Sequence, residues 1–220
     1  MAKVIGAQEA IASNVRDGMT LMVGGFGLVG APLTLIRALN ESPVKDLTII
    51  SNNLGEPGKA LGITHNLGKV RRGIGSYFTS NPDVARAYAE GRIEITLMPQ
   101  GTFAEAIRAG GAGLGGFYTP TGVGTLLAEG KEVREVGGKL CLLQEALTAD
   151  VALVRAHKAD ALGNLVYYKT ARNFNPLMAT AAKVVIAEVD EIVEVGGLDP
   201  ERIATPHLYV DYLVRAEERL

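Results

Sequence analysis

Short runs rich in aliphatic and β-branched residues recur along the chain. They cover residues 20–23, 47–50, 93–97, 151–154 and 184–187. The last two runs are apolar throughout, which is typical of strands that are buried on both faces, whereas a half-exposed strand alternates apolar and polar positions. The pattern therefore predicts at least five short strands, some of them covered on both sides.

Between these runs the apolar residues follow a helical spacing. Pro32 suits the first turn of a helix because its missing N–H would be unpaired there, and Leu35, Ala38 and Leu39 form a buried stripe after it. Three more helices are predicted in the same way. The first runs from Asn81–Pro82 to Gly91, with Val84, Ala87 and Tyr88 facing the core.

The second begins at a capping box, Thr102–Glu105, and turns Phe103, Ala106 and Ile107 inward. The third covers residues 176–182 and turns Leu177, Met178 and Ala181 inward.

Strands that alternate with helices indicate the α/β class. Strands that are apolar throughout and alternate with helices are typical of a largely parallel sheet that helices cover on both faces. We expect a mostly parallel central sheet flanked by helices. No internal repeat and no linker composition interrupts residues 1–220, so we expect a single domain.

Composition and charge remove several classes of protein. With 47% hydrophobic and 21% charged residues among 220, the chain is too apolar to be disordered. A net charge of −2 argues against nucleic acid and membrane surfaces as partners, because polyanions require clustered Lys and Arg. The single cysteine, Cys141, favours a reducing compartment and reads as a small buried apolar residue, so we expect a cytoplasmic protein.

Two uncharged stretches, residues 18–36 and 109–127, are long enough to cross a membrane. Both are interrupted by several glycines and a proline, and such backbone would leave amides unpaired in lipid. The first residues also lack the apolar core of a secretory signal peptide. We therefore expect loops at these places and no membrane span.

The first glycine-rich stretch follows a predicted strand and precedes a predicted helix. Gly25, Gly27 and Gly30 form G-x-G-x-x-G, a loop whose amides attract phosphate or carboxylate. A dinucleotide site would also need an acidic residue at the end of the next strand, where residues 50–53 are Ile-Ser-Asn-Asn. No G-K-[ST] follows, so the loop is no Walker motif either.

Five ordered motifs resemble those of the family I coenzyme A transferases, in their alpha-type subunit, from about residue 4 to 213. They are G-G-F-x-x-x-G-x-P at 24–32, the strand and asparagine pair at 46–53, P-Q-G-T-x-x-E-x-I-R-x-G-G-A-G at 99–113, F-Y-T-P-T-G at 117–122, and A-L-G-N-L with A-R-N-F-N at 161–165 and 171–175. The resemblance implies a CoA-transferase-like fold.

The resemblance also implies a chemistry and a partner. Family I enzymes move CoA from an acyl-CoA to a short-chain carboxylic acid through a mixed anhydride and a glutamyl-CoA thioester. The nucleophilic glutamate lies in a Ser-Glu-Asn-Gly stretch of the beta-type subunit, and this chain has no such stretch. By resemblance the chain is half of an enzyme, in an α2β2 assembly with a beta-type subunit, with coenzyme A as a substrate and no tightly bound cofactor.

The resemblance assigns roles to three groups of residues. Gln100 matches a glutamine beside the partner's catalytic glutamate. Asn52 and Asn53 are candidates for the acid-binding pocket. The predicted CoA-binding loop consists of Gly24, Gly25, Phe26, Gly27, Leu28, Val29 and Gly30.

Other polar residues carry weaker signals. His65, His157 and His207 lack the spacing of metal ligands, so we expect no metal. The pair Arg71–Arg72 is interpreted as an exposed face, with a CoA phosphate as the alternative partner. The uncharged loop at 117–122 is a candidate for the subunit interface.

The substrate pair that we expect is succinyl-CoA with a 3-oxoacid such as acetoacetate. An acetate or a 3-oxoadipate CoA transferase is nearly as similar. A stand-alone isomerase or dinucleotide-binding oxidoreductase, and a non-catalytic CoA-binding module, are the alternatives from other classes.

Overall fold

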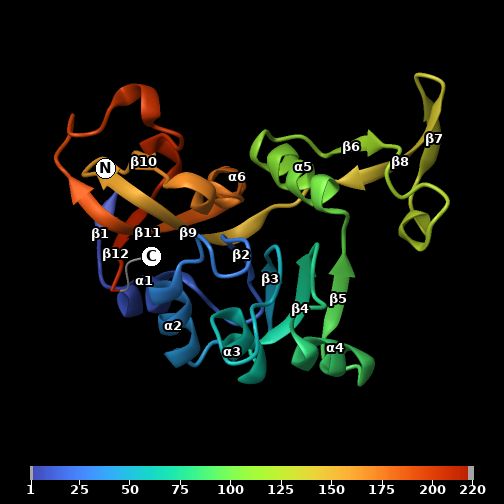
Figure 1. The fold of residues 1–220 in the computed structure, drawn as a ribbon, viewed down its shortest axis with the longest axis horizontal. Coiled ribbons are helices and arrows are strands. Elements are labelled where there is room, and N and C mark those ends of the chain that lie inside the picture. The colour runs from blue at the N-terminus through green and yellow to red at the C-terminus, as the bar shows by residue number, and fades with distance from the viewer. Residues whose placement is uncertain (1, 218–220) are drawn as a thin grey trace.

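A large sheet forms the centre of the structure, a computed structural model that describes residues 2–217 (Figure 1). Neighbouring strands pair in parallel, except for β10, which pairs antiparallel with β9. The spatial order is β1 (Lys3–Val4), β12 (Tyr212–Arg215), β11 (Ala182–Val193), β9 (Ala149–Asp160), β2 (Thr20–Val23), β3 (Leu47–Ile50), β4 (Val70–Gly75) and β5 (Glu94–Leu97), with β10 (Leu165–Val166) beside β9. The predicted α/β class with a mostly parallel sheet is confirmed.

The two faces of this sheet belong to two separate apolar clusters. Leu21 and Val23 of β2 belong to one cluster, whereas Met22 between them belongs to the other. Val151 and Ala152 of β9 divide in the same way. Successive side chains of a strand point to opposite faces, so only an apolar run can fill both clusters.

Helices cover both faces. Those of the first cluster are α1 (Ala7–Asn14), α2 (Leu33–Glu41), α3 (Leu61–Asn66) and α4 (Pro82–Ala89), and those of the second are α5 (Gln100–Gly111) and α6 (Asn175–Thr180). In Figure 1 α2, α3 and α4 lie below the strand ends, and α5 and α6 lie above them. Short 3-10 turns are η1 (Leu126–Ala128), η2 (Lys169–Arg172), η3 (Pro200–Arg202) and η4 (His207–Tyr209).

A second, three-stranded antiparallel sheet projects from the main body at the upper right of Figure 1. It has the order β6 (Gly116–Thr119), β8 (Lys139–Glu145) and β7 (Val133–Val136). The sequence predicted a loop at 117–122, but residues 116–119 form β6, because each pairs with a residue of β8. Cys141 is buried in β8, as expected.

Two helix predictions need correction. The helix predicted from Thr102 begins at Gln100, with Pro99 at the N-cap, so Thr102 lies buried inside the first turn instead of capping it. Tyr88 was predicted to face the core but is 58% exposed, since only Val84 and Ala87 of α4 reach the sheet. In the described part of the chain no helix is long and apolar enough to cross a bilayer.

We predict that Phe103→Ala destabilises the protein strongly. Phe103 is 0% exposed, and its ring meets that of Phe174 edge-on at 5.3 Å between centroids. Loss of a buried phenyl ring costs about 3–5 kcal/mol of unfolding free energy, measurable by urea denaturation. Tyr88→Ala removes an exposed aromatic ring and should change the value by less than about 0.5 kcal/mol. Equal effects of the two variants would contradict the packing described.

Candidate active site

The predicted site residues lie in loops that follow neighbouring parallel strands. Residues 24–30 follow β2, residues 51–53 follow β3, and Gln100 follows β5 after a short turn. Because β2, β3, β4 and β5 are adjacent and parallel, their carboxyl ends meet at one edge of the sheet. The hydroxyl of Ser51 donates to the carbonyl of Val23 at 2.8 Å and so ties the first two loops together.

Asn52 and Gln100 form a hydrogen-bonded group with Ser76, a residue that the sequence analysis missed. Asn52 Nδ2 donates to Ser76 Oγ at 2.9 Å and to Gln100 Oε1 at 3.1 Å, and Ser76 Oγ donates to Gln100 Oε1 at 3.2 Å. Ser76 follows β4, a strand without an apolar run, since Arg71 and Arg72 interrupt it. The structure thus brings loops after three strands together.

The position of Ser76 depends on a close approach of two strand ends. A Cβ on Gly75 would lie 2.1 Å from the carbonyl oxygen of Ser51, so only glycine fits there. The amides of Ser76 and Tyr77 then donate to the carbonyl of Asn52, at 3.2 and 3.0 Å. The turn after β4 is therefore fastened to the turn after β3.

Gln100 is the exposed member of the group. Its Oε1 accepts two hydrogen bonds, while its Nε2 has no hydrogen-bond partner within residues 2–217. Asn52 and Asn53 are 1% and 6% exposed, and their amides bond to each other, with Asn53 Nδ2 donating to Asn52 Oδ1 at 3.0 Å. Their direct contact with an acid stays a prediction, since both side chains face the interior.

The glycine loop has a packed base and an open tip. A Cβ on Gly24 would lie 1.8 Å from Asn175 Oδ1, and one on Gly30 would lie 2.4 Å from the carbonyl oxygen of Ala171. Phe26 and Val29 at the tip are 50% and 48% exposed and pair with each other through two backbone hydrogen bonds. The outer glycines are thus required by packing, and only the tip is open to a ligand.

The segment at 171–175 is what packs against this base. Asn173 Nδ2 donates to the carbonyl of Val29 at 2.9 Å, and Asn175 Nδ2 donates to that of Gly30 at 3.0 Å. Asn175 Oδ1 also accepts from the amide of Arg155 at 2.8 Å, which anchors it on β9. This gives the asparagines of the A-R-N-F-N motif a role that spacing alone could not reveal.

A carboxylate of the chain itself occupies the start of α2, the helix after the glycine loop. Glu188 of β11 is 0% exposed and accepts from the amide of Leu35 at 3.1 Å. It is also ion-paired with Arg155, which is 2% exposed. Burial raises the pKa of the Glu188 carboxyl, while Arg155 and the start of α2 offset that rise in part. The anion position that the glycine motif suggested is therefore filled from within.

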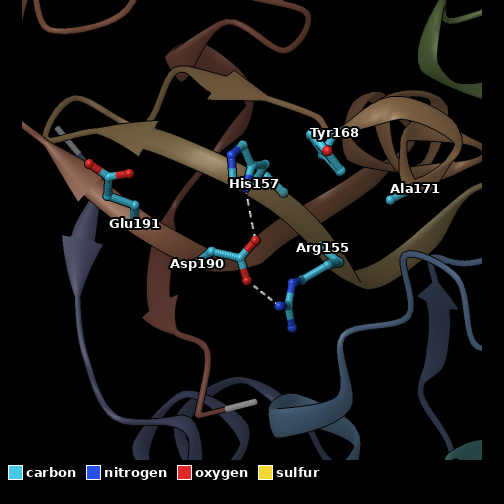
Figure 2. A pocket seen from close by; sticks show the side chains of 7 residues that line it. Arg155, His157, Tyr168, Ala171, Asp190 and Glu191 are labelled. Carbon is cyan, nitrogen blue, oxygen red and sulfur yellow. Dashed lines mark hydrogen bonds and ion pairs between the residues drawn. The ribbon is translucent and has the colours of Figure 1, made fainter. Parts of the chain in front are cut away.

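A cavity of about 420 Å³ is lined by Arg155, the cation of this ion pair (Figure 2). Asp190 lies between Arg155 and His157, with its Oδ2 at 3.0 Å from His157 Nδ1, and Tyr168 packs against the histidine ring. Within this lining Asp190 pairs with both Arg155 and His157. Because the carboxylate of Asp190 already occupies these cationic side chains, the cavity is not proposed as an anion-binding site.

His65, His207 and Arg71 take no part in the hydrogen bonds that join Asn52, Ser76 and Gln100. His65 is buried, and burial lowers its pKa, while His207 bonds to Asn164. Arg71 is exposed and meets Glu94 at 3.6 Å, near the amino end of β4, about 16 Å of strand away from Ser76. In the described residues no three His, Cys, Asp or Glu side chains are grouped to hold a metal ion.

Comparison with known proteins decides the family. The family model described as coenzyme A transferase matches residues 4–216, nearly the whole chain. The chain belongs to the coenzyme A transferase family. This confirms the family that the five motifs indicated.

Two relatives place this CoA transferase chain more closely within the family, and one solved structure shares its fold. It is 53% identical to one subunit of the succinyl-CoA:3-ketoacid coenzyme A transferase of Xanthomonas campestris, over 94% of this chain and 86% of that one. It is 49% identical to the alpha subunit of the acetate CoA-transferase of Escherichia coli, over 92% of both chains. The acyl-CoA transferase from E. coli O157:H7 has the same fold, with a TM-score of 0.87 at 23% identity over all of this chain and 48% of that one.

We predict that Gly24→Ala destabilises this CoA transferase chain. The added methyl group would overlap Asn175 Oδ1, which already accepts from Arg155 in the interior. The overlap should cost about 1–3 kcal/mol of unfolding free energy, measurable by thermal or urea denaturation.

Gly101→Ala is the matched control, because a Cβ there meets nothing within 4 Å and lies on α5. Alanine favours helix over glycine, so this variant should gain up to about 1 kcal/mol. A Gly24→Ala protein as stable as the parent would show that Asn175 does not fill this position.

Proposed function

We propose that the chain is the alpha-type subunit of a CoA transferase that moves CoA between a short-chain acyl-CoA and a 3-oxoacid, with succinyl-CoA and acetoacetate as the pair. The observation that carries the proposal is the Gln100 amide. Within residues 2–217 it offers an NH2 group at the carboxyl edge of the sheet with no carboxylate bonded to it. Family membership gives this half-site its chemistry.

The missing carboxylate comes from a beta-type subunit in this proposal, in an α2β2 assembly. A glutamate of that partner attacks the thioester carbonyl and expels CoA as thiolate, which leaves a mixed anhydride. The thiolate then attacks the glutamyl carbonyl, forms the glutamyl-CoA thioester and releases the first acid as its carboxylate. The acceptor acid reverses both steps, so no redox cofactor is consumed.

Gln100 is the residue of this chain that we place beside the reacting groups. Each attack turns a carbonyl oxygen into an oxyanion, and an amide N–H that is already in position stabilises that charge without reorganisation. The two bonds to Gln100 Oε1 hold the amide still before the partner arrives. The Phe26–Val29 tip of the glycine loop, exposed at the same edge, is the proposed contact with CoA.

The nature of the acids stays within the proposal. Relatives named for succinyl-CoA with 3-ketoacid and for acetate are similarly close, at 53% and 49% identity. The acetate and 3-oxoadipate types therefore remain second candidates, and a panel of these acids distinguishes them. We place the enzyme in the cytoplasm, because its single cysteine is a free thiol.

We predict that the chain alone transfers no CoA and that activity appears on reconstitution with its beta-type partner, found by pull-down from the native cells. In the complex Gln100→Ala should lower kcat about 100-fold, the usual cost of one oxyanion donor. The partner's intact mass should rise by that of CoA, less water, when acyl-CoA is added.

Gln8→Ala is the control for this variant, because Gln8 is an exposed glutamine on α1 that bonds to Glu41. It should keep the parent's kcat. Turnover by the chain alone, or a CoA adduct on this chain, would contradict the proposed division of roles and favour the isomerase or oxidoreductase alternative. CoA binding that no glutamate-bearing chain converts into turnover would favour the non-catalytic module.

We predict that Phe26→Ala raises KM for acyl-CoA and leaves unfolding free energy within about 0.5 kcal/mol of the parent value, since half of the ring is exposed. The reason is loss of apolar contact between the loop tip and CoA. Steady-state kinetics at saturating acid measure the effect, with Tyr88→Ala as the control. An unchanged KM would show that the tip of the glycine loop does not contribute to the binding of acyl-CoA.

A further inference from the structure

We propose that Asn53 is a positioning residue for Gln100. The backbone N–H of Gly55 sets the direction of a chain of side-chain hydrogen bonds, and that direction turns the NH2 group of Gln100 outward. The inference deepens the proposed function and rests on it, because the proposed function supplies the carboxylate that this NH2 group meets.

The chain of bonds starts from a group with only one polarity. The Gly55 amide donates to Asn53 Oδ1 at 2.8 Å, and a backbone N–H can never accept, so the Asn53 atom there has to be oxygen. The backbone of Gly55 has little room to rotate its N–H away from Asn53, because it lies directly against the backbone of Gly62. A Cβ on Gly55 would be 2.3 Å from the amide nitrogen of Gly62, and Gly55 has a φ of +69°.

Each later bond inherits its direction from this first one. With its oxygen on Gly55, Asn53 presents Nδ2 to Asn52 Oδ1 at 3.0 Å. Asn52 then presents Nδ2 to Ser76 Oγ at 2.9 Å and to Gln100 Oε1 at 3.1 Å. The Ser76 hydroxyl, which has accepted from Asn52, passes its own proton to Gln100 Oε1 at 3.2 Å. Both bonds require oxygen at that end of Gln100.

Rotation of the Asn52 or Asn53 side-chain amide by half a turn is costly, because water cannot reach these groups to replace the lost hydrogen bonds. Asn52 and Asn53 are 1% and 6% exposed, so a turned amide would set oxygen against oxygen inside the protein. Gln100 is exposed and would be free to turn by itself, yet its oxygen is claimed by two donors. The outward group is therefore a donor, which suits a carboxylate or an oxyanion, and an acceptor there would repel both.

Asn53→Asp tests this with the smallest change available. The new carboxylate still accepts from Gly55 but has no N–H for Asn52. Asn52 then turns its own amide so that Nδ2 donates to this carboxylate, its oxygen faces Gln100, and Gln100 turns its oxygen outward. In the reconstituted complex we expect kcat to fall about 100-fold, as for loss of an oxyanion donor, with a much smaller change in KM.

Asn164→Asp is the matched control. The Asn164 side chain donates to Asp160 Oδ2 at 2.7 Å and accepts from the amide of His207 at 2.8 Å, and it shares no hydrogen bond with Gly55, Asn53, Asn52, Ser76 or Gln100. The new carboxylate would face the buried carboxylate of Asp160. This variant should change thermal stability as much as Asn53→Asp does, or more, and leave kcat at the parent value. Equal losses of kcat in the two variants would overturn the proposal.

A double variant separates positioning from general damage. If Asn53 acts through Gln100, Asn53→Asp has no further effect on kcat in the Gln100→Ala background, and losses that multiply would overturn the proposal. Ser76→Ala, which keeps the bond between Asn52 and Gln100, serves if Asn53→Asp fails to fold. It should give a smaller loss of kcat that is likewise absent in Gln100→Ala.

A readout without activity keeps this inference apart from the proposed function. In NMR spectra of the full-length protein, the side-chain NH2 signal of Gln100 is assigned by its loss in Gln100→Ala. The protons of this group should exchange rapidly with water. In Asn53→Asp they should exchange more slowly, because the NH2 group then donates to Asn52. An unchanged exchange rate overturns the positioning role, whereas a Gln100→Ala complex with full kcat overturns the proposed function and leaves the hydrogen-bond chain standing.

Discussion

The buried ion pair of Arg155 and Glu188 is the interaction on which the carboxyl edge of the sheet depends. It joins β9 to β11, and each partner then supports one side of the glycine loop. Glu188 accepts from the amide of Leu35 at the start of α2, which follows the loop. The backbone N–H of Arg155 donates to Asn175, and Asn175 fills the space beside Gly24 and donates to the carbonyl of Gly30. Two buried charges are costly, so they persist only where further partners satisfy them: here the Leu35 amide bonds to Glu188, and Asp190 pairs with the Arg155 guanidinium.

The same ion pair explains why the glycine-rich loop after β2 need not hold a pyrophosphate at the start of the next helix. In dinucleotide-binding folds the start of the next helix is open and receives a pyrophosphate. Here a phosphate would have to displace Glu188 and leave Arg155 to pair with the ligand. The glycines at the two ends of G-x-G-x-x-G are explained by packing instead. A Cβ on Gly25 would lie 3.1 Å from Ala31, one on Gly30 would lie 2.4 Å from the carbonyl oxygen of Ala171, and Phe26 and Val29 form a hairpin between them. This loop therefore has the glycine spacing of a dinucleotide-binding loop, but packing within the protein accounts for its first and last glycines.

The sequence predicted those parts of the fold that apolar patterning controls. Residues 20–23 and 47–50 were predicted as strands and form β2 and β3 with the same bounds. β9 and β11 extend well past the predicted 151–154 and 184–187, because their apolar runs end where Arg155 and Glu188 begin, and pairing of the two strands carries both onward. The strand that positions Ser76 escaped prediction, since arginines break its pattern. Motif resemblance found Gln100 and the asparagines, but only the folded structure shows which of their atoms bond to each other.

The neutral character of Gln100 is itself part of the proposed chemistry. A cation beside the partner's glutamate would bind the resting carboxylate tightly and so weaken it as a nucleophile, whereas catalysis requires stronger binding in the transition state than in the ground state. A neutral amide binds the carboxylate more weakly and still donates to each oxyanion as it forms. Within residues 2–217 the hydrogen bonds of Asn52, Ser76 and Gln100 include no Lys, Arg or His partner. The buried hydrogen bonds of Asn53 and Asn52 thus allow a neutral group to do what a cation would otherwise do. They fix the orientation of the Gln100 N–H donor before the reaction begins, so the donor does not have to reorient as the oxyanion forms.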